Sequence, residues 1–384
     1  MHAAELAAAG LVTCFGRGVV RSWDALLAGR CGFVSRAFRD GSRAALVAPV
    51  PEEVLPWEAH GEDRALALVR LAVEELAGAP ALEAVRPSRL GVAVGSTQGT
   101  IRAWEEGQRR GADPRYRPAL PHPSEPALEV ARRLGAAGPL ANPSMACASG
   151  AAAVGLGLSW LRRGECDAVV VGGVDALSGF VHAGFSALRA LDSGAPRPFD
   201  AARAGLGLGE AAVLLVLRPA REGSETRVTG YGCAADAHHL TGPDPAGGGA
   251  RRAMQAALAD ARLPADAVDL VSAHGTGTPY NDLMESQALA GLFGPTVGTR
   301  PVHSVKGAFG HTLAAAGALE ALVCDLALRE GLFPATVGLE RLDPAIALDV
   351  VRGAPRRGDF RAALSLSAGF GGINAALVLE RPRA

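Results

Sequence analysis

The stretch "NPSMACASGAAAVGLGLSWL" (residues 142–161) places one cysteine, Cys147, among small residues where a strand-like segment ends and an apolar helix begins. A thiol at the start of a helix lies beside unpaired backbone N–H groups and the positive end of the helix dipole. Both lower the pKa of the thiol and favour a nucleophilic thiolate. The alternative is a structural role, because free cysteine is among the residue types most often buried. This stretch alone leaves catalysis and packing both open.

Short apolar runs closed by glycine alternate with longer helical patterns along the rest of the chain. Continuous Val, Leu and Ala runs are typical of strands that are buried on both faces. They predict strands over residues 90–96, 167–177, 209–217, 268–275 and 362–372. An apolar period of about 3.6 residues predicts helices over residues 62–78, 247–263 and 311–331. The fold class is therefore α/β.

The cysteine stretch has a counterpart in the second half of the chain. Residues 89–164 contain a strand, a polar glycine turn, a second strand and a small-residue helix, and residues 269–331 repeat this order. The repeat predicts two copies of one α/β unit. We place the boundary in a charged, glycine-containing stretch, which gives an N-terminal half over 1–225 and a C-terminal half over 226–384.

Composition excludes several classes of function. The chain has 384 residues, a net charge of −1 and no block of like charges, so we expect no nucleic-acid partner and no membrane partner. Its six cysteines lack CxxC pairs and zinc spacing, which predicts reduced thiols and no metal site. No secretory leader and no apolar run of about 18 residues is present, and we therefore expect a cytoplasmic protein.

Two glycine turns of the second half carry polar side chains. "SAHGTGTP" (272–279) holds His274 at the tip of a predicted strand, where α/β folds place their ligands, and "HSVKGAFGHTL" (303–313) holds Lys306 and His311. Either histidine alone could be structural. Lys306 lies in an apolar tract, and a buried ammonium needs a counter-charge.

Glu285 is the candidate counter-charge for Lys306, because it follows His274 on the next predicted helix. Asp282 and Glu285 also fit a D-x-x-E capping box, which would explain the glutamate locally. Both interpretations of Glu285 stay open at this point.

Six motifs, in this order along the chain, resemble those of elongating β-ketoacyl-acyl carrier protein synthases, the condensing enzymes of the thiolase-like superfamily. The motifs are "ACASG", "APRPFDAARAGLGLGEAA", "DAHHLTGPDPAGGGARRAM", "AHGTGTP", "SVKGAFGHT" and "GFGGINAALV". The resemblance covers about residues 85–380. It implies the duplicated five-layered αβαβα fold and agrees with the internal repeat.

The resemblance also implies a role for each matching residue. Cys147 would accept the acyl group, His274 and His311 would act on malonyl-carrier protein, and Lys306 and Glu285 would form a supporting ion pair. Phe370 would gate the site. The remaining implied groups are Gly369, Thr276 and Thr278 for substrate binding, and the backbone N–H groups of Cys147 and Phe370 as an oxyanion hole.

The implied reaction is a decarboxylative condensation of malonyl-carrier protein with the acyl group held on Cys147, which elongates a fatty-acid, polyketide or polyene chain. It implies no metal or redox cofactor, since both substrates travel on the phosphopantetheine of an acyl carrier protein. Homodimers, or heterodimers with a related subunit, are implied as well.

The sequence departs from the family pattern at three positions. Met145 precedes "ACASG" where a small or hydroxylated residue is common, Ala204 replaces an acid, and Asn281 replaces a glycine. These changes bear on the pocket and on carrier preference, and none replaces the cysteine or a histidine. The strings "TPYNDLMES" and "FGHTLAAAGALEA" look closest to synthases of polyene and specialised fatty-acid pathways.

Four alternatives compete with an elongating synthase. A chain-length-factor partner usually lacks the cysteine, and a degradative thiolase needs a second catalytic cysteine near the last glycine turn. A three-carbon-priming synthase of the same fold has Asn in place of His311. An unrelated cysteine hydrolase would leave Lys306 and the second histidine without a purpose.

Overall fold

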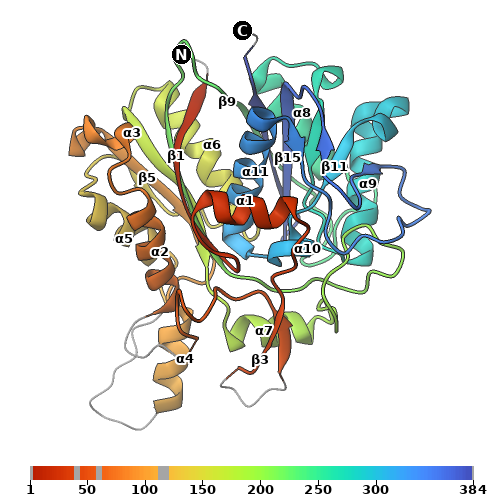
Figure 1. Ribbon diagram of the computed structural model, residues 1–384, viewed down its shortest axis with the longest axis horizontal. Coiled ribbons are helices and arrows are strands. Elements are labelled where there is room, and N and C mark those ends of the chain that lie inside the picture. Colours follow the sequence, from red (N-terminus) through yellow and green to blue (C-terminus); the bar gives the residue numbers. More distant parts are fainter. Residues whose placement is uncertain (1–2, 39–43, 58–62, 111–120, 383–384) are drawn as a thin grey trace.

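The computed structural model describes residues 3–38, 44–57, 63–110 and 121–382. Its main sheet runs in the order β13-β11-β10-β15-β16-β9-β1-β8-β7-β5-β6, and β2 pairs with β1 at the side. Helices cover both ends of this arrangement and fill its middle (Figure 1). The predicted α/β class is confirmed.

The sheet consists of two halves with the same strand order. In each half the first strand lies at the seam, followed by the last strand. The remaining strands continue outward, three in the N-terminal half and four in the C-terminal half. The N-terminal strands are β1 (Ala4–Thr13), β5 (Leu90–Gly95), β6 (Leu140–Ala141), β7 (Ala168–Asp175) and β8 (Ala211–Pro219). Their C-terminal counterparts are β9 (Arg227–Ala235), β10 (Leu270–Ser272), β11 (Pro301–His303), β15 (Ala362–Gly369) and β16 (Ile373–Glu380), with β13 (Asp349–Val350) at the outer edge.

The pairing directions repeat as well. The two strands nearest the seam are antiparallel to their neighbours in each half, and the outer strands are parallel. The halves meet where β1 pairs with β9 through Ala4 and Val228. The boundary at residues 225/226 stays a prediction, but the duplicated order of strands is what the repeat in the sequence predicted.

Helices form three layers around the two half-sheets. Figure 1 shows α11 between the two half-sheets, and α6 packs against it. The N-terminal half carries α2 and α5 on its outer face, and the C-terminal half carries α8 and α9. The bounds are α2 (Arg64–Glu75), α5 (Glu125–Leu134), α6 (Ser149–Arg162), α8 (Gly248–Ala261), α9 (Pro279–Phe293) and α11 (Ala316–Glu330).

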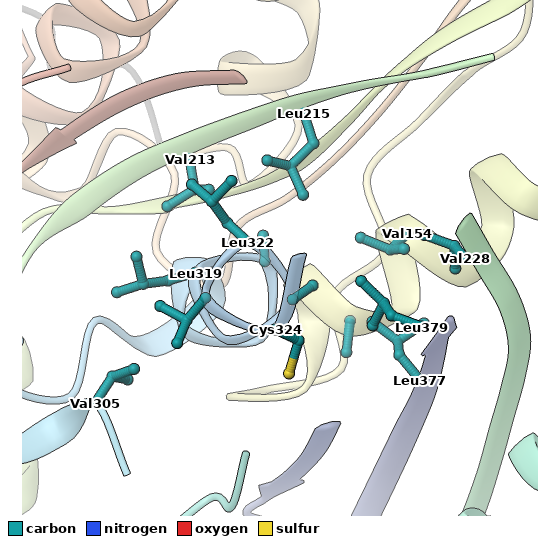
Figure 2. Packing of buried hydrophobic residues seen from close by; sticks show 14 of the residues in the cluster. Val154, Val213, Leu215, Val228, Val305, Leu319, Leu322, Cys324, Leu377 and Leu379 are labelled. Atoms are coloured by element: carbon teal, nitrogen blue, oxygen red, sulfur yellow. The ribbon is translucent and has the colours of Figure 1, made fainter. Parts of the chain in front are cut away.

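Each half-sheet is buried on both faces, which explains its continuous apolar runs. In β8, Val213 and Leu215 point into the core around α11, whereas Leu214 and Val216 point into the core beneath α2. Figure 2 shows Leu319 of α11 in the same central core as the β8 side chains. The five layers therefore enclose a central core and two outer cores, which is why the strands are mostly apolar on both faces.

Small residues let the two central helices approach each other closely. A Cβ on Gly150 of α6 would lie 2.6 Å from the carbonyl oxygen of Ala314, and a Cβ on Gly317 of α11 would lie 2.6 Å from the nitrogen of Ala151. The Gly/Ala composition of the opening stretch is thus a packing requirement. It brings the starts of α6 and α11 together.

Shorter elements connect or cover this framework. They are β2 (Gly16–Arg17), β3 (Val34–Arg36), β4 (Ala45–Val47), β12 (Leu332–Phe333), β14 (Arg356–Arg357), α1 (Val19–Leu27), α3 (Pro80–Glu83), α4 (Ile101–Arg110), α7 (Gly179–Ala187) and α10 (Lys306–Phe309), with single turns η1 (Pro87–Arg89), η2 (Ala265–Ala267), η3 (Gly294–Thr299) and η4 (Leu313–Ala315). In the described parts of the chain, every helix is too short or too polar to cross a bilayer.

Candidate active site

Cys147 lies in a tight turn two residues before α6 begins. Ala146 adopts a left-handed conformation with φ 48°, and the hydroxyl of Ser149 accepts from the N–H of Met145 at 2.8 Å. The same hydroxyl donates to the carbonyl of Ala146 at 2.6 Å. The first residue of α6 therefore holds the turn, and the thiol is presented at the helix start, as predicted.

The predicted lowering of the thiol pKa is wrong. Cys147 is only 8% exposed, and burial raises the pKa of its thiol to about 12. The charge of Lys306 acts in the opposite direction, while Asp175 and Glu320 add to the increase. Loss of hydration outweighs the stabilisation that a helix end offers, because the thiolate has few water contacts here. Cys147 is a neutral thiol at pH 7 in the free protein.

The rings of His274 and His311 lie next to each other. His274 follows β10 in the chain, and His311 precedes α11. Their ring centroids lie 5.3 Å apart, and the rings are nearly perpendicular at 83°. His274 is 3% exposed and His311 is 2% exposed. Burial and the nearby Lys306 charge hold the pKa of both imidazoles well below the usual value, so both are neutral at pH 7.

Hydrogen bonds fix the tautomer of each ring. Lys306 Nζ lies 3.3 Å from His274 Nδ1, and an ammonium can only donate, so this nitrogen accepts. The backbone N–H of Leu313 donates to His311 Nδ1 at 3.3 Å. Each Nδ1 being an acceptor, each proton resides on Nε2. The site thus holds two neutral Nε2–H donors.

The predicted partner of Lys306 is wrong. Its ammonium pairs with Glu320 Oε1 at 2.5 Å and also donates to the backbone carbonyl of His274 at 2.5 Å. Lys306 and Glu320 are both almost completely buried, and Ser367 donates to the second oxygen of Glu320 at 2.8 Å. The ion pair therefore connects α10 with α11 and fastens His274 to both.

Glu285 instead binds the backbone of the turn that carries His274. Its carboxylate accepts from the N–H groups of His274 and Gly275, the latter at 2.8 Å. Burial raises the pKa of Glu285 to about 8. The capping-box interpretation is wrong too, because α9 begins at Pro279, ahead of Asp282. Glu285 positions His274 without forming an ion pair with Lys306.

One cavity of about 410 Å³ brings most of the predicted residues together, but Lys306 and Glu285 are not among the described residues that line it. Its lining includes Cys147, His274, His311, Thr276, Thr278, Gly369 and Phe370. Phe370 is 36% exposed, and its ring centroid lies 5.5 Å from that of Phe185 on α7. This position at the cavity wall suits the predicted gate. The hydroxyls of Thr276 and Thr278 lie 2.8 Å apart.

Gly369 lets the last glycine turn approach the cysteine turn. A Cβ at this position would lie 3.1 Å from Cβ of Ala146 and 3.2 Å from the nitrogen of Cys147. The chain after Gly369 therefore passes directly beside Cys147. The oxyanion hole from the backbone N–H groups of Cys147 and Phe370 stays a prediction.

The three departures from the family pattern lie at or beside this cavity. Ala204 and Asn281 line it, and Met145 packs against the central core next to the cysteine turn. Asn281 Nδ2 also donates to Asp282 at 3.2 Å. Ala204 and Asn281 can therefore affect which substrate fits.

Two parts of the site were not assigned from the sequence. Glu320 could have been suspected, because it is an isolated acid in the otherwise apolar start of α11. The segment 236–243 contributes Asp236, His239 and Thr241 to the cavity lining. His239 Nδ1 accepts from the N–H of Thr241 at 3.1 Å, which orders this segment. Its motif was noticed, but no spacing signalled which side chains line the cavity.

Cavity access changes the expected order of cysteine alkylation. Cys147 lines the cavity, whereas Cys14, Cys166 and Cys324 are buried elsewhere with raised thiol pKa values. We expect iodoacetamide to modify Cys147 before these three. Peptide mapping by mass spectrometry over time measures the order, and earlier labelling of Cys166 would contradict it.

The exposed cysteines serve as the reference in that experiment. Cys31 and Cys233 are exposed, so their labelling reports the unhindered rate. The lowered pKa that the sequence predicts for Cys147 would have made it react ahead of these two as well. A neutral, buried thiol removes the reason for that part of the prediction.

Comparison with known proteins agrees with this arrangement. Residues 53–223 match the family described as "Beta-ketoacyl synthase, N-terminal domain", and residues 226–340 match the corresponding C-terminal domain. The tetracenomycin polyketide synthase ketoacyl synthase alpha subunit of Streptomyces glaucescens is 33% identical over 96% of this chain and 94% of its own. The 3-oxoacyl-[acyl-carrier-protein] synthase 2 of Staphylococcus aureus (strain COL) is 36% identical over 76% of this chain and 75% of its own.

Solved structures resemble the whole chain. The structure titled "The ishigamide ketosynthase/chain length factor" has a TM-score of 0.90 and 31% identity, and it covers 100% of both chains. A type II polyketide synthase ketosynthase in complex with its acyl-carrier protein, AntDE:AntF, has a TM-score of 0.87 and 26% identity over 99% of this chain and 100% of its own.

Proposed function

Since the chain belongs to the β-ketoacyl synthase family and is a condensing acyltransferase, we propose that Cys147, His274 and His311 perform a decarboxylative condensation on carrier-bound substrates. One observation supports this most directly. A thiol and two neutral Nε2–H donors line the same cavity. These are the groups that acyl transfer and enolate stabilisation require.

The first half-reaction transfers an acyl group to Cys147. The sulfur attacks the thioester carbonyl of the acyl-carrier protein, and the pantetheine sulfur leaves. The proton of Cys147 ends on the departing pantetheine thiol. Lys306 and the start of α6 favour the developing thiolate, and the backbone N–H groups of Cys147 and Phe370 are the proposed donors to the oxyanion.

The second half-reaction uses the histidines. Malonyl-carrier protein loses carbon dioxide, and the electron pair of the broken C–C bond becomes an enolate on the thioester. The Nε2–H groups of His274 and His311 donate to the enolate oxygen. Its carbon then attacks the acyl-Cys147 thioester and forms the C–C bond of the β-ketoacyl product. The sulfur leaves as a thiolate, which takes up a proton from solvent. We propose that no metal or redox cofactor takes part.

The neutral state of both imidazoles supports this assignment. Each ring is buried near the Lys306 ammonium, so a second positive charge there would be costly. Each neutral ring still has an Nε2–H group that can donate to a developing negative charge. The fixed Nδ1 contacts mean that neither ring must reorient during the reaction.

We propose an acyl carrier protein and a second synthase-like subunit as partners. AntDE:AntF joins a ketosynthase to its carrier protein, and the ishigamide structure contains a ketosynthase and a chain length factor. Cys147 acts as the nucleophile in the proposal, and the cytoplasmic location stays a prediction.

A non-elongating chain-length-factor role is the second candidate, because a structural relative contains such a subunit. Incubation with acyl- and malonyl-carrier protein, followed by mass spectrometry of the carrier, separates the two. A product with two more carbons and a β-keto group supports the synthase. Absence of acyl-Cys147 and of product, with and without an added ketosynthase-like subunit, would contradict it.

A further inference from the structure

Asp175 ends β7 as a completely buried acid that the proposed mechanism does not use. Its Oδ1 accepts from the hydroxyl of Ser96 at 2.8 Å and from the N–H groups of Thr97 and Gln98 at 3.1 Å each. Its Oδ2 accepts from the hydroxyl of Thr97 at 2.7 Å and from the N–H of Ala314 at 3.0 Å. Burial raises the pKa of Asp175, and these donors act in the opposite direction by satisfying both of its oxygens without a cation.

Among these donors, only Ala314 comes from the C-terminal half of the chain. It is the middle residue of η4, the single turn between His311 and α11. The neighbouring N–H of Leu313 is the donor that fixes the His311 tautomer. The bond from Ala314 to Asp175 therefore ties this catalytic turn to the sheet of the other half.

The turn needs such an anchor because its backbone is strained. Leu313 has φ 52°, a left-handed conformation that a residue with a side chain adopts only where its surroundings hold it. The carbonyl of Ala314 is held on its other side by close packing. A Cβ on Gly173 or Gly150 would lie 2.2 or 2.6 Å from this oxygen.

We propose that Asp175 is a positioning residue for His311, whose carboxylate holds the strained turn so that the imidazole presents Nε2–H to the cavity shared with Cys147. This inference rests on the proposed function, since decarboxylation is the step that needs His311. Asp175 itself does not line the cavity.

The carboxylate that supports His311 also disfavours ionisation of the nucleophile, Cys147. Its negative charge contributes to the raised pKa of Cys147, after burial and against the charge of Lys306, while Glu320 acts in the same direction as Asp175. Neutralising Asp175 therefore makes Cys147 easier to ionise. Loss of the Asp175 charge should therefore slow decarboxylation, which depends on the position of His311. It should ease acyl transfer, which depends on ionisation of Cys147.

Asp175→Asn tests this prediction. The amide keeps the size of the side chain, but its two ends cannot accept from all three backbone N–H groups. We expect carbon dioxide release from malonyl-carrier protein to fall about 10²-fold in kcat, the cost of a displacement of about 1 Å, with KM unchanged. Alkylation of Cys147 by iodoacetamide, followed at several pH values, should stay equal or become faster.

Two controls separate positioning from general damage. Ser96→Ala removes one donor to Oδ1 and leaves the Ala314 contact, so decarboxylation should remain near the parent rate. In the His311→Ala background, Asp175→Asn should slow decarboxylation little further, because the residue that it positions is already absent.

Several outcomes would overturn the inference. One is decarboxylation by Asp175→Asn at the parent rate, and another is an equal loss of alkylation and decarboxylation in this variant. A third is a double variant with His311→Ala whose decarboxylation falls by the product of the two single losses. If Asp175→Asn does not fold, Thr97→Val replaces it, because the Thr97 hydroxyl donates to Oδ2, the oxygen that accepts from Ala314, whereas Ser96 donates to Oδ1. Without this donor Oδ2 is free to move away from Ala314, and decarboxylation should fall. Parent-level decarboxylation by folded Thr97→Val would then overturn the inference. Failure of the parent protein to release carbon dioxide would instead refute the proposed function.

Discussion

Replacement of Cys147 by Ala is expected to abolish condensation while malonyl-carrier protein still loses carbon dioxide. The sulfur is needed to hold the acyl group, but it does not stabilise the enolate. The two imidazoles keep their contacts through Lys306 and Leu313, neither of which involves the thiol. Decarboxylation and bond formation should therefore separate in this variant.

His274→Ala and His311→Ala should have the complementary effect. Each removes one preorganised donor to the enolate, and loss of such a donor typically costs about 10²–10³ in rate. Acyl loading onto Cys147 is expected to persist, because Lys306 and the start of α6 remain to favour the thiolate. The expected pattern is slow carbon dioxide release with an intact acyl-enzyme.

Carbon dioxide release and acyl-enzyme mass, measured in parallel on the three variants, check both expectations. Asn in place of each histidine is the matched control, because its amide can still donate a hydrogen bond and should recover part of the decarboxylation rate. Condensation by Cys147→Ala, or parent-level decarboxylation by both alanine variants, would contradict the assigned roles.

The ion pair between Lys306 and Glu320 should dominate stability around the site. Glu320→Ala leaves a buried ammonium without its counter-charge, which typically costs about 3–5 kcal/mol in the free energy of unfolding. Activity should fall as well, since Lys306 also holds His274 through Nδ1 and its carbonyl. Denaturant unfolding and condensation assays measure the two effects.

A paired replacement identifies the true partner of Lys306. Combining Lys306→Met with Glu320→Leu removes both charges, and apolar replacement of a whole buried pair is often neutral or stabilising. Stability should recover while activity stays low, because His274 has lost its donor. Combining Lys306→Met with Glu285→Leu should show no recovery. Equal recovery in both pairs would contradict the assignment of Glu320.

Much of this site could be predicted because its residues lie in ordered motifs at the ends of strands. Cys147, His274 and His311 line one cavity, as expected from glycine turns that follow or precede recognisable elements. The partner of Lys306 could not be predicted in this way. Glu320 reaches it only because the fold places α10 beside the start of α11, whereas Glu285 is suggested by its closeness to His274 in sequence.

The prediction of a lowered pKa for the Cys147 thiol is wrong for a different physical reason. The helix start was correctly identified, but the sign of the shift depends on how much water reaches the sulfur. Burial to 8% exposure decides the result, and exposure follows from the whole surrounding fold. A local motif reveals that the thiol lies at a helix start, but it does not reveal how much water burial removes from the sulfur.

The first strand, β1, was missed for a similar reason. Its sequence, "AELAAAGLVT", is rich in good helix formers and lacks a valine run like that of β7. It becomes a strand because β8 and β9 provide a partner on each side. Tertiary pairing overrides local preference here.

The position of β1 at the seam has a consequence for synthesis on the ribosome. The strand is made long before its main partner β8, which ends at Pro219, so the N-terminal sheet cannot close until the whole intervening chain has emerged. At about 5–20 residues per second, that delay lasts on the order of tens of seconds. Throughout it, the apolar strand is exposed to unwanted pairing with other nascent chains. We therefore expect a chaperone that binds residues 4–13 during translation to raise the yield of folded protein.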